Sequence, residues 1–326
     1  MSAQVSQTAP SLPDDRAAMP RRFAGFLRER ASGGVIGGLL LVLIAGACFG
    51  TLRWSLARYE QQHLGVTDEE LPPRSPSVAE PMGSDGLGRS LVWRVLLGGA
   101  VSLTVGLAAA GLAVTIGVAW GLTAGYAGGR LDAAMMRMVD VIYGLPAILL
   151  VVMLGLALET PLLSLCRSLL GGAASRQAAG AATLWIAIGA VSWLTMSRVI
   201  RGQVLSLREQ PFVEAARAIG LSPGRIMLRH LLPNLAAPIV VYATLTVPMA
   251  ILQESTLSFL GIGIKLPLPS WGNLAAQGVE ELNPIGGMNW WLLLFPCVAL
   301  GLTLLSLNFL GEAMRKKLDP RRRERQ

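Results

Sequence analysis

Six long uncharged stretches dominate the chain, and polar segments separate them. The stretches are residues 31–52, 95–129, 141–158, 177–197, 230–253 and 282–311. Each is close to, or longer than, the ~20 residues that an α-helix needs to cross ~30 Å of hydrocarbon. A helix suits a bilayer because its backbone satisfies its own hydrogen bonds. The pattern therefore predicts an all-α integral membrane protein with six transmembrane helices and with both termini on the same side.

The distribution of Lys and Arg predicts the orientation of these helices. With the N-terminus inside, the inner segments contain 20 of the 28 basic residues. Because basic residues in short loops favour the cytoplasmic side, we expect both termini to be cytoplasmic. The net charge of +8 is compatible with a nucleic-acid partner, but the excess lies beside the membrane, where anionic lipids attract it. We therefore expect membrane lipid, and no nucleic acid, as its partner.

The same pattern divides the chain into successive parts with different environments. They are a cytoplasmic lead (1–32), a first transmembrane helix (33–52), an extracytoplasmic segment (53–94), a five-helix core (95–312) that includes a cytoplasmic loop (198–234), and a basic cytoplasmic tail (313–326). Residues 159–180 within the core match no motif. The loop is the longest polar interruption of the core, and it is therefore the first place to look for a contact with another protein.

The second uncharged stretch is longer than one membrane crossing requires. It lacks a polar turn for a hairpin, so we expect one helix near residues 98–126, tilted or flanked by interfacial turns. Glycines recur at every fourth position within it, at Gly117, Gly121, Gly125 and Gly129. Small residues at this spacing let another helix approach closely in lipid. The sequence therefore predicts a helix–helix contact here without naming the second helix.

Residues suited to catalysis or ion coupling are scarce in the uncharged stretches. Glu254 follows the fifth stretch and is flanked by Gln, Ser and Thr, so we expect it to satisfy hydrogen bonds at a helix end, with a substrate contact as the alternative. The three cysteines and two histidines are scattered without metal-ligand spacing. A membrane-embedded enzyme needs paired acids or a nucleophile with a base, and a secondary transporter needs several intramembrane ionisable groups. The pattern favours neither class.

The loop at 198–234 contains a short amphipathic segment between two helix signals. Pro211 suits the first position of a helix, and Gly220 suits its C-terminal cap. Ser222 and Pro223 predict the N-cap and first residue of a second short helix, which Pro233 would end or kink. We expect one apolar face on the first helix, formed by Phe212, Val213, Ala216 and Ile219. The two helices together predict a rigid knob that another protein can grip.

The same loop contains Glu214-Ala215-Ala216, followed by Gly220 and by Leu232-Pro233. With these residues it resembles the EAA loop of the permease subunits of binding-protein-dependent ABC importers. His230 stands where the wider family has Ile, a departure typical of the peptide-importer branch. Other motifs that resemble the family occur along the chain in the family's order, at residues 81–89, 125–129, 201–209, 254–261, 269–272 and 318–321. The branch that the chain resembles is the second permease subunit of dipeptide, oligopeptide and nickel importers.

The resemblance implies the fold and the partners. The last five helices would form a type I (MetI-like) permease core, and the loop would be the coupling helix that seats in a groove of an ATPase subunit. Its contact residues would be Phe212, Glu214, Ala215, Ala216, Arg217, Gly220, Leu221, Leu232 and Pro233. The implied partners are a homologous second permease, two ABC ATPase subunits and an extracytoplasmic solute-binding protein. Segments 81–89 and 269–272 are the expected contacts with that receptor.

The chain itself lacks the sequence of a nucleotide site. A phosphate-binding loop needs Gly-Lys-Ser/Thr, and none of the three lysines (Lys265, Lys316 and Lys317) follows a glycine. We therefore expect a transport subunit and no enzyme, with no cofactor or metal of its own and with ATP and Mg²⁺ on the partner ATPases. The expected solutes are dipeptides and oligopeptides, with nickel, glutathione or an oligosaccharide as alternatives. The expected location is a prokaryotic cytoplasmic (inner) membrane.

Overall fold

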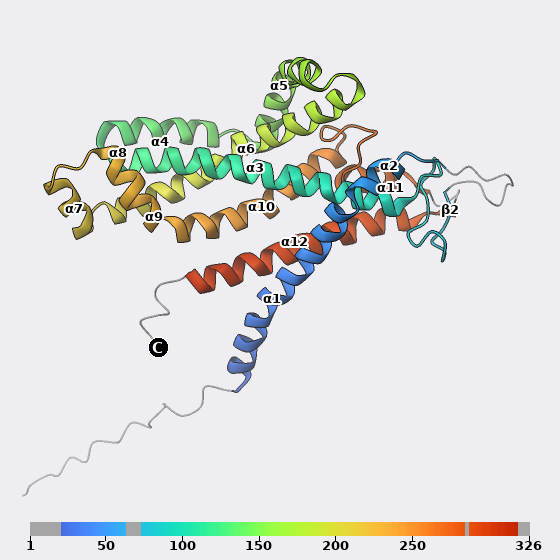
Figure 1. Ribbon diagram of the computed structural model, residues 1–326, viewed down its shortest axis with the longest axis horizontal. Coiled ribbons are helices and arrows are strands. Elements are labelled where there is room, and N and C mark those ends of the chain that lie inside the picture. Colours follow the sequence, from blue (N-terminus) through green and yellow to red (C-terminus); the bar gives the residue numbers. More distant parts are fainter. Residues whose placement is uncertain (1–20, 63–72, 284–286, 319–326) are drawn as a thin grey trace, which may run out of the picture.

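Six long helices form the framework of the part of the chain that the structure describes (Figure 1). The computed structural model describes residues 21–62, 73–283 and 287–318. The long helices are α1 (Arg21–Gly50), α3 (Leu91–Ala127), α5 (Ala147–Leu170), α6 (Gly172–Leu207), α10 (Ala236–Phe259) and α12 (Trp290–Leu318). Within the described residues, these six contain stretches long and apolar enough to cross a membrane. The prediction of an all-α protein with six spans is confirmed.

Shorter elements collect at the two ends of the bundle (Figure 1). One end, here called the α7 end, carries α7 (Pro211–Ala218), α8 (Pro223–Ile226), the wide π-helical turn η2 (Met227–Leu231) and α9 (Leu232–Asn234). The opposite end, here called the α11 end, carries α2 (Leu52–Arg58), α11 (Trp271–Glu280) and the small hairpin of β1 (Leu282–Asn283) and β2 (Gly287–Met288). The loop predicted as a knob and the segments predicted to meet a receptor thus lie far apart.

The second span is one continuous helix. α3 has 37 residues and starts at Leu91 instead of near residue 98, without a flanking turn. At 1.5 Å per residue it is about 55 Å long, well beyond the ~30 Å of a hydrocarbon layer. Its first turns persist because Leu91, Arg94 and Val95 are buried against neighbouring elements of the α11 end. The helix therefore connects the two ends directly.

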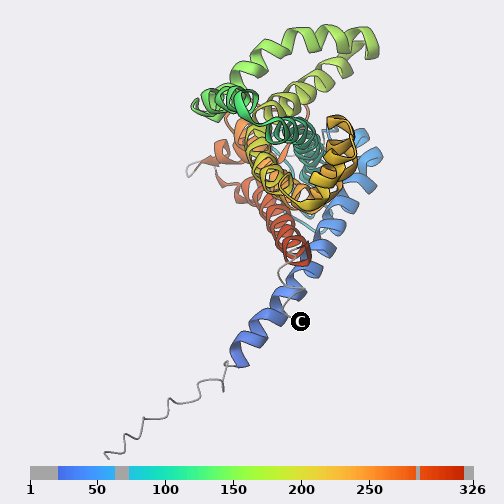
Figure 2. The same cartoon turned by 90° about the vertical axis from the view of Figure 1, so that its left-hand side faces the viewer.

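The third span differs from its prediction. Residues 141–158 fall on two helices, α4 (Gly129–Tyr143) and α5, because Pro146 lacks an N–H and disfavours the helical conformation of the residue before it. Glu159 does not end α5, because the helix continues to Leu170. The Glu159 carboxylate accepts a hydrogen bond from Lys265 Nζ. The α5–α6 hairpin, which includes most of 159–180, projects sideways from the bundle (Figure 2).

α3 and α6 pack closely along a glycine ridge, formed by Gly117, Gly121 and Gly125. A methyl group added at Gly121 would lie 2.4 Å from the carbonyl oxygen of Ser197 in α6. At the other two positions it would lie 2.5 Å from Met196 Cβ and 2.8 Å from Val204 Cβ, both in the same helix. The predicted close contact is confirmed, and α6 is its partner.

Gly129 continues the four-residue spacing along the sequence, but it does not take part in the contact between α3 and α6. It starts α4 with a φ of 57°, directly after Gly128 with a φ of 66°. No atom lies within 4 Å of the position that its Cβ would take. Glycine is favoured at these two positions because the left-handed region carries no penalty without a Cβ. Gly129 therefore serves the turn between α3 and α4, and the prediction that it belongs to the ridge is wrong.

Glu254 is fully buried in α10 and surrounded by serines. Ser258 Oγ donates to Oε1 at 2.7 Å, and Ser255 Oγ lies 3.3 Å from Oε2. Ser102 of α3 and Ser270, the N-cap of α11, also hydrogen-bond to this carboxylate. Its side chain has no exposed surface. The interpretation that Glu254 satisfies hydrogen bonds is confirmed, and the carboxylate joins three elements at one point.

The glycine ridge predicts that one added methyl group will destabilise the bundle. We expect Gly121→Ala to lower the free energy of unfolding by about 1–3 kcal/mol, because the surrounding backbone must move apart. Gly111→Ala in the same helix is the control, since open space surrounds that position. For Gly111→Ala we expect the free energy of unfolding not to fall, and to rise by up to about 1 kcal/mol because alanine has a higher helix propensity than glycine. Thermal unfolding of the purified variants in detergent measures both, and equal melting temperatures would contradict the ridge.

Candidate functional site

α7 has defined start and stop signals. Gln210 is the extended N-cap residue, and Pro211 occupies the first turn, where its missing N–H costs nothing. At the other end Gly220 has a φ of 80°, its N–H donates to Arg217 O at 2.9 Å, and the Leu221 N–H donates to Ala216 O at 3.1 Å. This pair of bonds is the Schellman motif. The predicted helix start and cap are confirmed.

The inner side of α7 is anchored in a small apolar core. Val213 and Ala216 are buried there with Ile200 and Val204 of α6 and with Ile226 of α8. Leu231 and Leu235 continue this core towards α10. Side chains without exposed surface at the junction leave little room for α7 to move by itself. α7 is therefore attached firmly to both α6 and the segment leading into α10.

The outer side of α7 carries polar and apolar side chains together. Glu214, Ala215 and Arg217 are exposed, Phe212 is 39% exposed and Ile219 is 75% exposed. The prediction of one apolar face is therefore wrong. Phe212 is rotated by about 100° from Val213 around the helix, and Ile219 lies beyond the last helical residue. As a result, two apolar side chains point away from the molecule and two point into it.

The chain after α7 follows the predicted second helix only at its start. Ser222 and Pro223 stand at the N-cap and first position of α8, although the Ser222 hydroxyl makes no capping bond. The helix then widens in η2, where the Leu232 N–H reaches back to Met227 O, and continues through Pro233 towards α10. A wide turn before a proline accommodates its ring and its missing N–H. Pro233 therefore does not end the helical segment, which widens directly before it.

All nine residues predicted for an ATPase contact lie at the α7 end, but they differ in exposure. Six are exposed: Phe212, Glu214, Ala215, Arg217, Gly220 and Pro233. Ala216 is buried, and Leu221 and Leu232 are partly buried within the apolar core beneath α7 or beside it. Of the two alanines that were predicted as contact residues, Ala215 is accessible to a partner and Ala216 is not. Ala216 instead lets α7 lie close to its own bundle.

Ion pairs beneath α7 fix α4 to α6. Arg201 donates to both carboxylate oxygens of Asp132, at 2.6 and 2.7 Å, and Arg198 donates to Asp140 at 2.8 Å. Arg208 donates to the carbonyl of Gly125 at 3.1 Å. A bidentate pair constrains orientation as well as distance. No sequence pattern predicts these contacts, because Asp132 and Arg201 are 69 positions apart and no spacing rule joins them.

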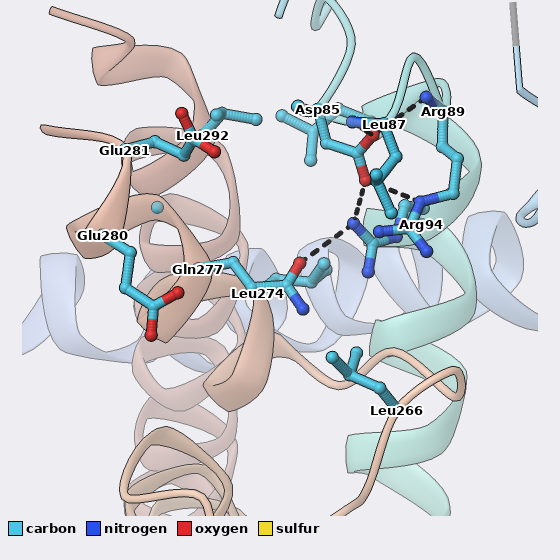
Figure 3. A pocket seen from close by; sticks show the side chains of 13 residues that line it. Asp85, Leu87, Arg89, Arg94, Leu266, Leu274, Gln277, Glu280, Glu281 and Leu292 are labelled. Atoms are coloured by element: carbon cyan, nitrogen blue, oxygen red, sulfur yellow. Dashed lines mark hydrogen bonds and ion pairs between the residues drawn. The ribbon is translucent and has the colours of Figure 1, made fainter.

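The α11 end holds a second cluster, centred on Asp85 (Figure 3). Asp85 Oδ1 accepts the backbone N–H groups of Leu87 and Arg89, and Oδ2 accepts Arg89 Nε at 2.8 Å and Arg94 Nη1. The same Arg94 nitrogen donates to Gln277 Oε1 at 3.0 Å. Asp85 and Arg94 are buried. The cluster therefore ties the segment before α3 to both α3 and α11.

A cavity of about 270 Å³ lies beside this cluster, with Glu280 and Glu281 on its far wall (Figure 3). The tip of the 81–89 segment remains accessible, since Gly86 is exposed and Leu87 is 51% exposed. Residues 269–272 are different, because all four are buried between neighbouring helices. Trp271 Nε1, for example, donates to Val95 O at 3.0 Å. The prediction of a receptor contact at 269–272 is therefore wrong for this structure.

Comparison with known proteins identifies relatives of the chain. The family described as "Binding-protein-dependent transport system inner membrane component" matches residues 117–324. The dipeptide transport system permease protein DppC of Bacillus subtilis is 38% identical over 285 residues, which cover 87% of this chain and 80% of the relative. The oligopeptide transport system permease protein OppC of Escherichia coli K12 is 38% identical over 288 residues, covering 87% and 86%.

A solved structure shares the fold. The chain from the MetNI methionine ABC transporter in inward-facing conformations matches with a TM-score of 0.50 at 19% identity, over 70% of this chain and 97% of that chain. At this identity the likeness concerns the fold only, and it confirms the expected MetI-like arrangement. The motifs at both ends, the six spanning helices and these relatives agree with one another. The chain is a multi-pass membrane protein, and it belongs to the family of binding-protein-dependent transport system inner membrane components.

Proposed function

We propose that the chain is the permease subunit of an ATP-driven importer of dipeptides and oligopeptides. The relatives that carry peptide-permease names match more than four fifths of the chain. The observation that carries the proposal is the form of α7, which is anchored on one side and exposed on the other. Val213 and Ala216 hold it to the bundle, while Phe212, Glu214 and Arg217 are exposed to a partner, although the Arg217 guanidinium also lies over the ring of Tyr126. Such a helix suits the transfer of force between two proteins.

In this proposal the energy comes from separate chains. The sequence lacks a phosphate-binding loop, so two ATPase subunits bind ATP and Mg²⁺ and seat α7 in a groove. Closure of the ATPase pair then displaces α7 as a rigid body. Because α7 shares its core with α6 and the segment leading into α10, the displacement reaches both helices. With a homologous second permease, the two subunits alternate access between the membrane faces.

The orientation follows from the basic residues. The α7 end carries the inner-loop arginines and is proposed to face the cytoplasm, together with both termini. The α11 end then faces the extracytoplasmic side of the bacterial inner membrane. There the exposed tip at Gly86 and Leu87 is proposed to meet the solute-binding protein. That receptor selects the solute, so nickel, glutathione and oligosaccharide remain alternative cargoes.

A secondary transporter is the alternative class, and one observation bears against it. Such proteins couple transport to ions through ionisable groups that line a path. Glu254, the candidate for that role, has no exposed surface and hydrogen-bonds to serines of its own chain. A reconstituted vesicle assay separates the two classes. Uptake that requires the ATPase subunits and ATP supports the proposal, and uptake driven by an ion gradient without them would overturn it.

Disruption of the C-terminal cap of α7 is predicted to abolish coupling to the ATPase subunits without preventing membrane insertion. We expect Gly220→Val to abolish ATP-driven uptake while membrane insertion remains, because a β-branched residue with a φ of 80° carries about 1–3 kcal/mol of strain. Gly220→Asn is the matched control, since Asn tolerates this conformation, and uptake should persist. A bulky residue at Glu214, such as Glu214→Trp, should act like Gly220→Val. Receptor-stimulated ATPase activity and uptake in vesicles measure the effect, and normal values in both bulky variants would refute the coupling role.

A substitution at the exposed tip of the 81–89 segment is predicted to weaken the contact with the receptor. We expect Leu87→Ala to reduce the affinity of the purified permease complex for the liganded receptor, because this side chain is half-exposed on a segment fixed by Asp85. Val78→Ala serves as the control, since Val78 is fully exposed outside the motif. Binding of labelled receptor to nanodisc-embedded complexes measures both. An unchanged affinity in Leu87→Ala would exclude the tip as a docking contact.

A further inference from the structure

A cleft lies between the α5–α6 hairpin and the segment that leads from α10 to α11. Its volume is about 960 Å³, within the range of about 300–1,000 Å³ that is usual for small-molecule sites. Leu156 of α5 and Leu184 of α6 line one side, and Ile264 and Leu268 of the connecting segment line the other. Because this segment runs into α11, the cleft belongs to the part of the molecule nearer the α11 end.

Charged side chains of both signs surround an interior that is mainly apolar. Lys265 Nζ donates to Glu159 Oε1 across the cleft, and both side chains remain substantially accessible, at 66% and 45%. Arg176 and Glu60 are also exposed lining residues. Two cations and two anions therefore balance one another at the rim. This combination suits a molecule that carries both charges and apolar side chains.

Thr183 adds a polar group to the interior. It is only 7% exposed, and its Oγ1 has no hydrogen-bond partner among the described residues. By contrast, the hydroxyls of Thr104 and Thr123 in α3 donate to the carbonyl four residues earlier. A buried hydroxyl without a partner is unfavourable unless another group supplies one. Thr183 lines the cleft, so a bound molecule with amide groups is a suitable partner.

Two glycines keep the cleft open. A methyl group added at Gly180 would meet no atom within 4 Å, and at Gly155 it would meet only Thr183 Cγ2 at 3.9 Å. Both residues line the cleft from facing helices. They differ from the glycines of the ridge, which are in close contact with a neighbouring helix. Their effect is to leave free space beside Thr183.

We propose that this cleft binds the transported peptide during its passage through the subunit, an inference that rests on the proposed importer function. The apolar walls take side chains, Thr183 hydrogen-bonds to a peptide amide, and the charges at the rim receive the terminal amino and carboxylate groups. A lipid acyl chain uses neither the hydroxyl nor the paired charges. The peptide therefore accounts for more of the lining than lipid does.

Filling the cleft tests this proposal. In vesicles that contain the complete importer and receptor, we expect Gly180→Leu to lower the uptake of radiolabelled trialanine per ATP hydrolysed by about tenfold, which corresponds to about 1.4 kcal/mol. Receptor-stimulated ATPase activity should persist, because α7 is untouched. Gly46→Leu is the matched control: Gly46 is exposed in α1, open space surrounds it, and it does not line the cleft. Its uptake should equal that of the unaltered chain.

Thr183→Val tests the same site without adding volume. It removes a hydroxyl that has no partner within the described structure, so the subunit should fold at least as well as before. A reduced uptake per ATP in this variant supports a bond to the peptide. Unchanged uptake in both Gly180→Leu and Thr183→Val overturns the proposed site. Failure of the proposed importer function would be recognised by a different result, because uptake by the unaltered chain would then not depend on ATP.

Discussion

The close contact between α3 and α6 is the constraint on which the other features depend. Lipid offers no hydrophobic drive for two apolar helices to associate, so short-range packing must supply it. The glycine ridge allows that packing, with Gly121 directly against the backbone of α6 at Ser197. The two helices also supply four of the nine described buried residues in the core beneath α7, which are Leu122 of α3 and Met196, Ile200 and Val204 of α6. Any change in their separation therefore alters the support of the α7 end.

The α7 end combines firm attachment with an exposed outer surface. Val213 and Ala216 fill the core beneath α7, and the bidentate pair of Arg201 and Asp132 holds α4 to α6 alongside it. Only the short turns at residues 208–210 and 219–222 separate α7 from α6 and from α8, and α8 continues through η2 and α9 towards α10. A displacement of α7 is thus passed on to the bundle instead of being absorbed in a loop. This rigidity is the physical basis of the proposed coupling.

The α11 end depends on buried polar groups. Asp85, Arg94 and Gln277 join the segment before α3 to α11, and Glu254 joins α10 to serines of α3 and α11. A buried charge is costly unless hydrogen bonds or an opposite charge compensate it. Removing one member of such a group leaves the others uncompensated, so each cluster favours one arrangement of its helices. The cleft beside this end is therefore bounded by elements in defined positions.

Local chemistry made much of this protein predictable from its sequence. The length of the uncharged stretches determined six spans, and Pro211 and Gly220 determined the limits of α7, since these signals act within one helix. Only the tertiary structure decided that the ridge meets α6, that Phe212 faces outward while Ala216 faces inward, and that Trp271 is buried. It also decided that Lys265 pairs with Glu159 across a cleft. Contacts between distant parts of a chain depend on how whole helices pack, which no local residue pattern specifies.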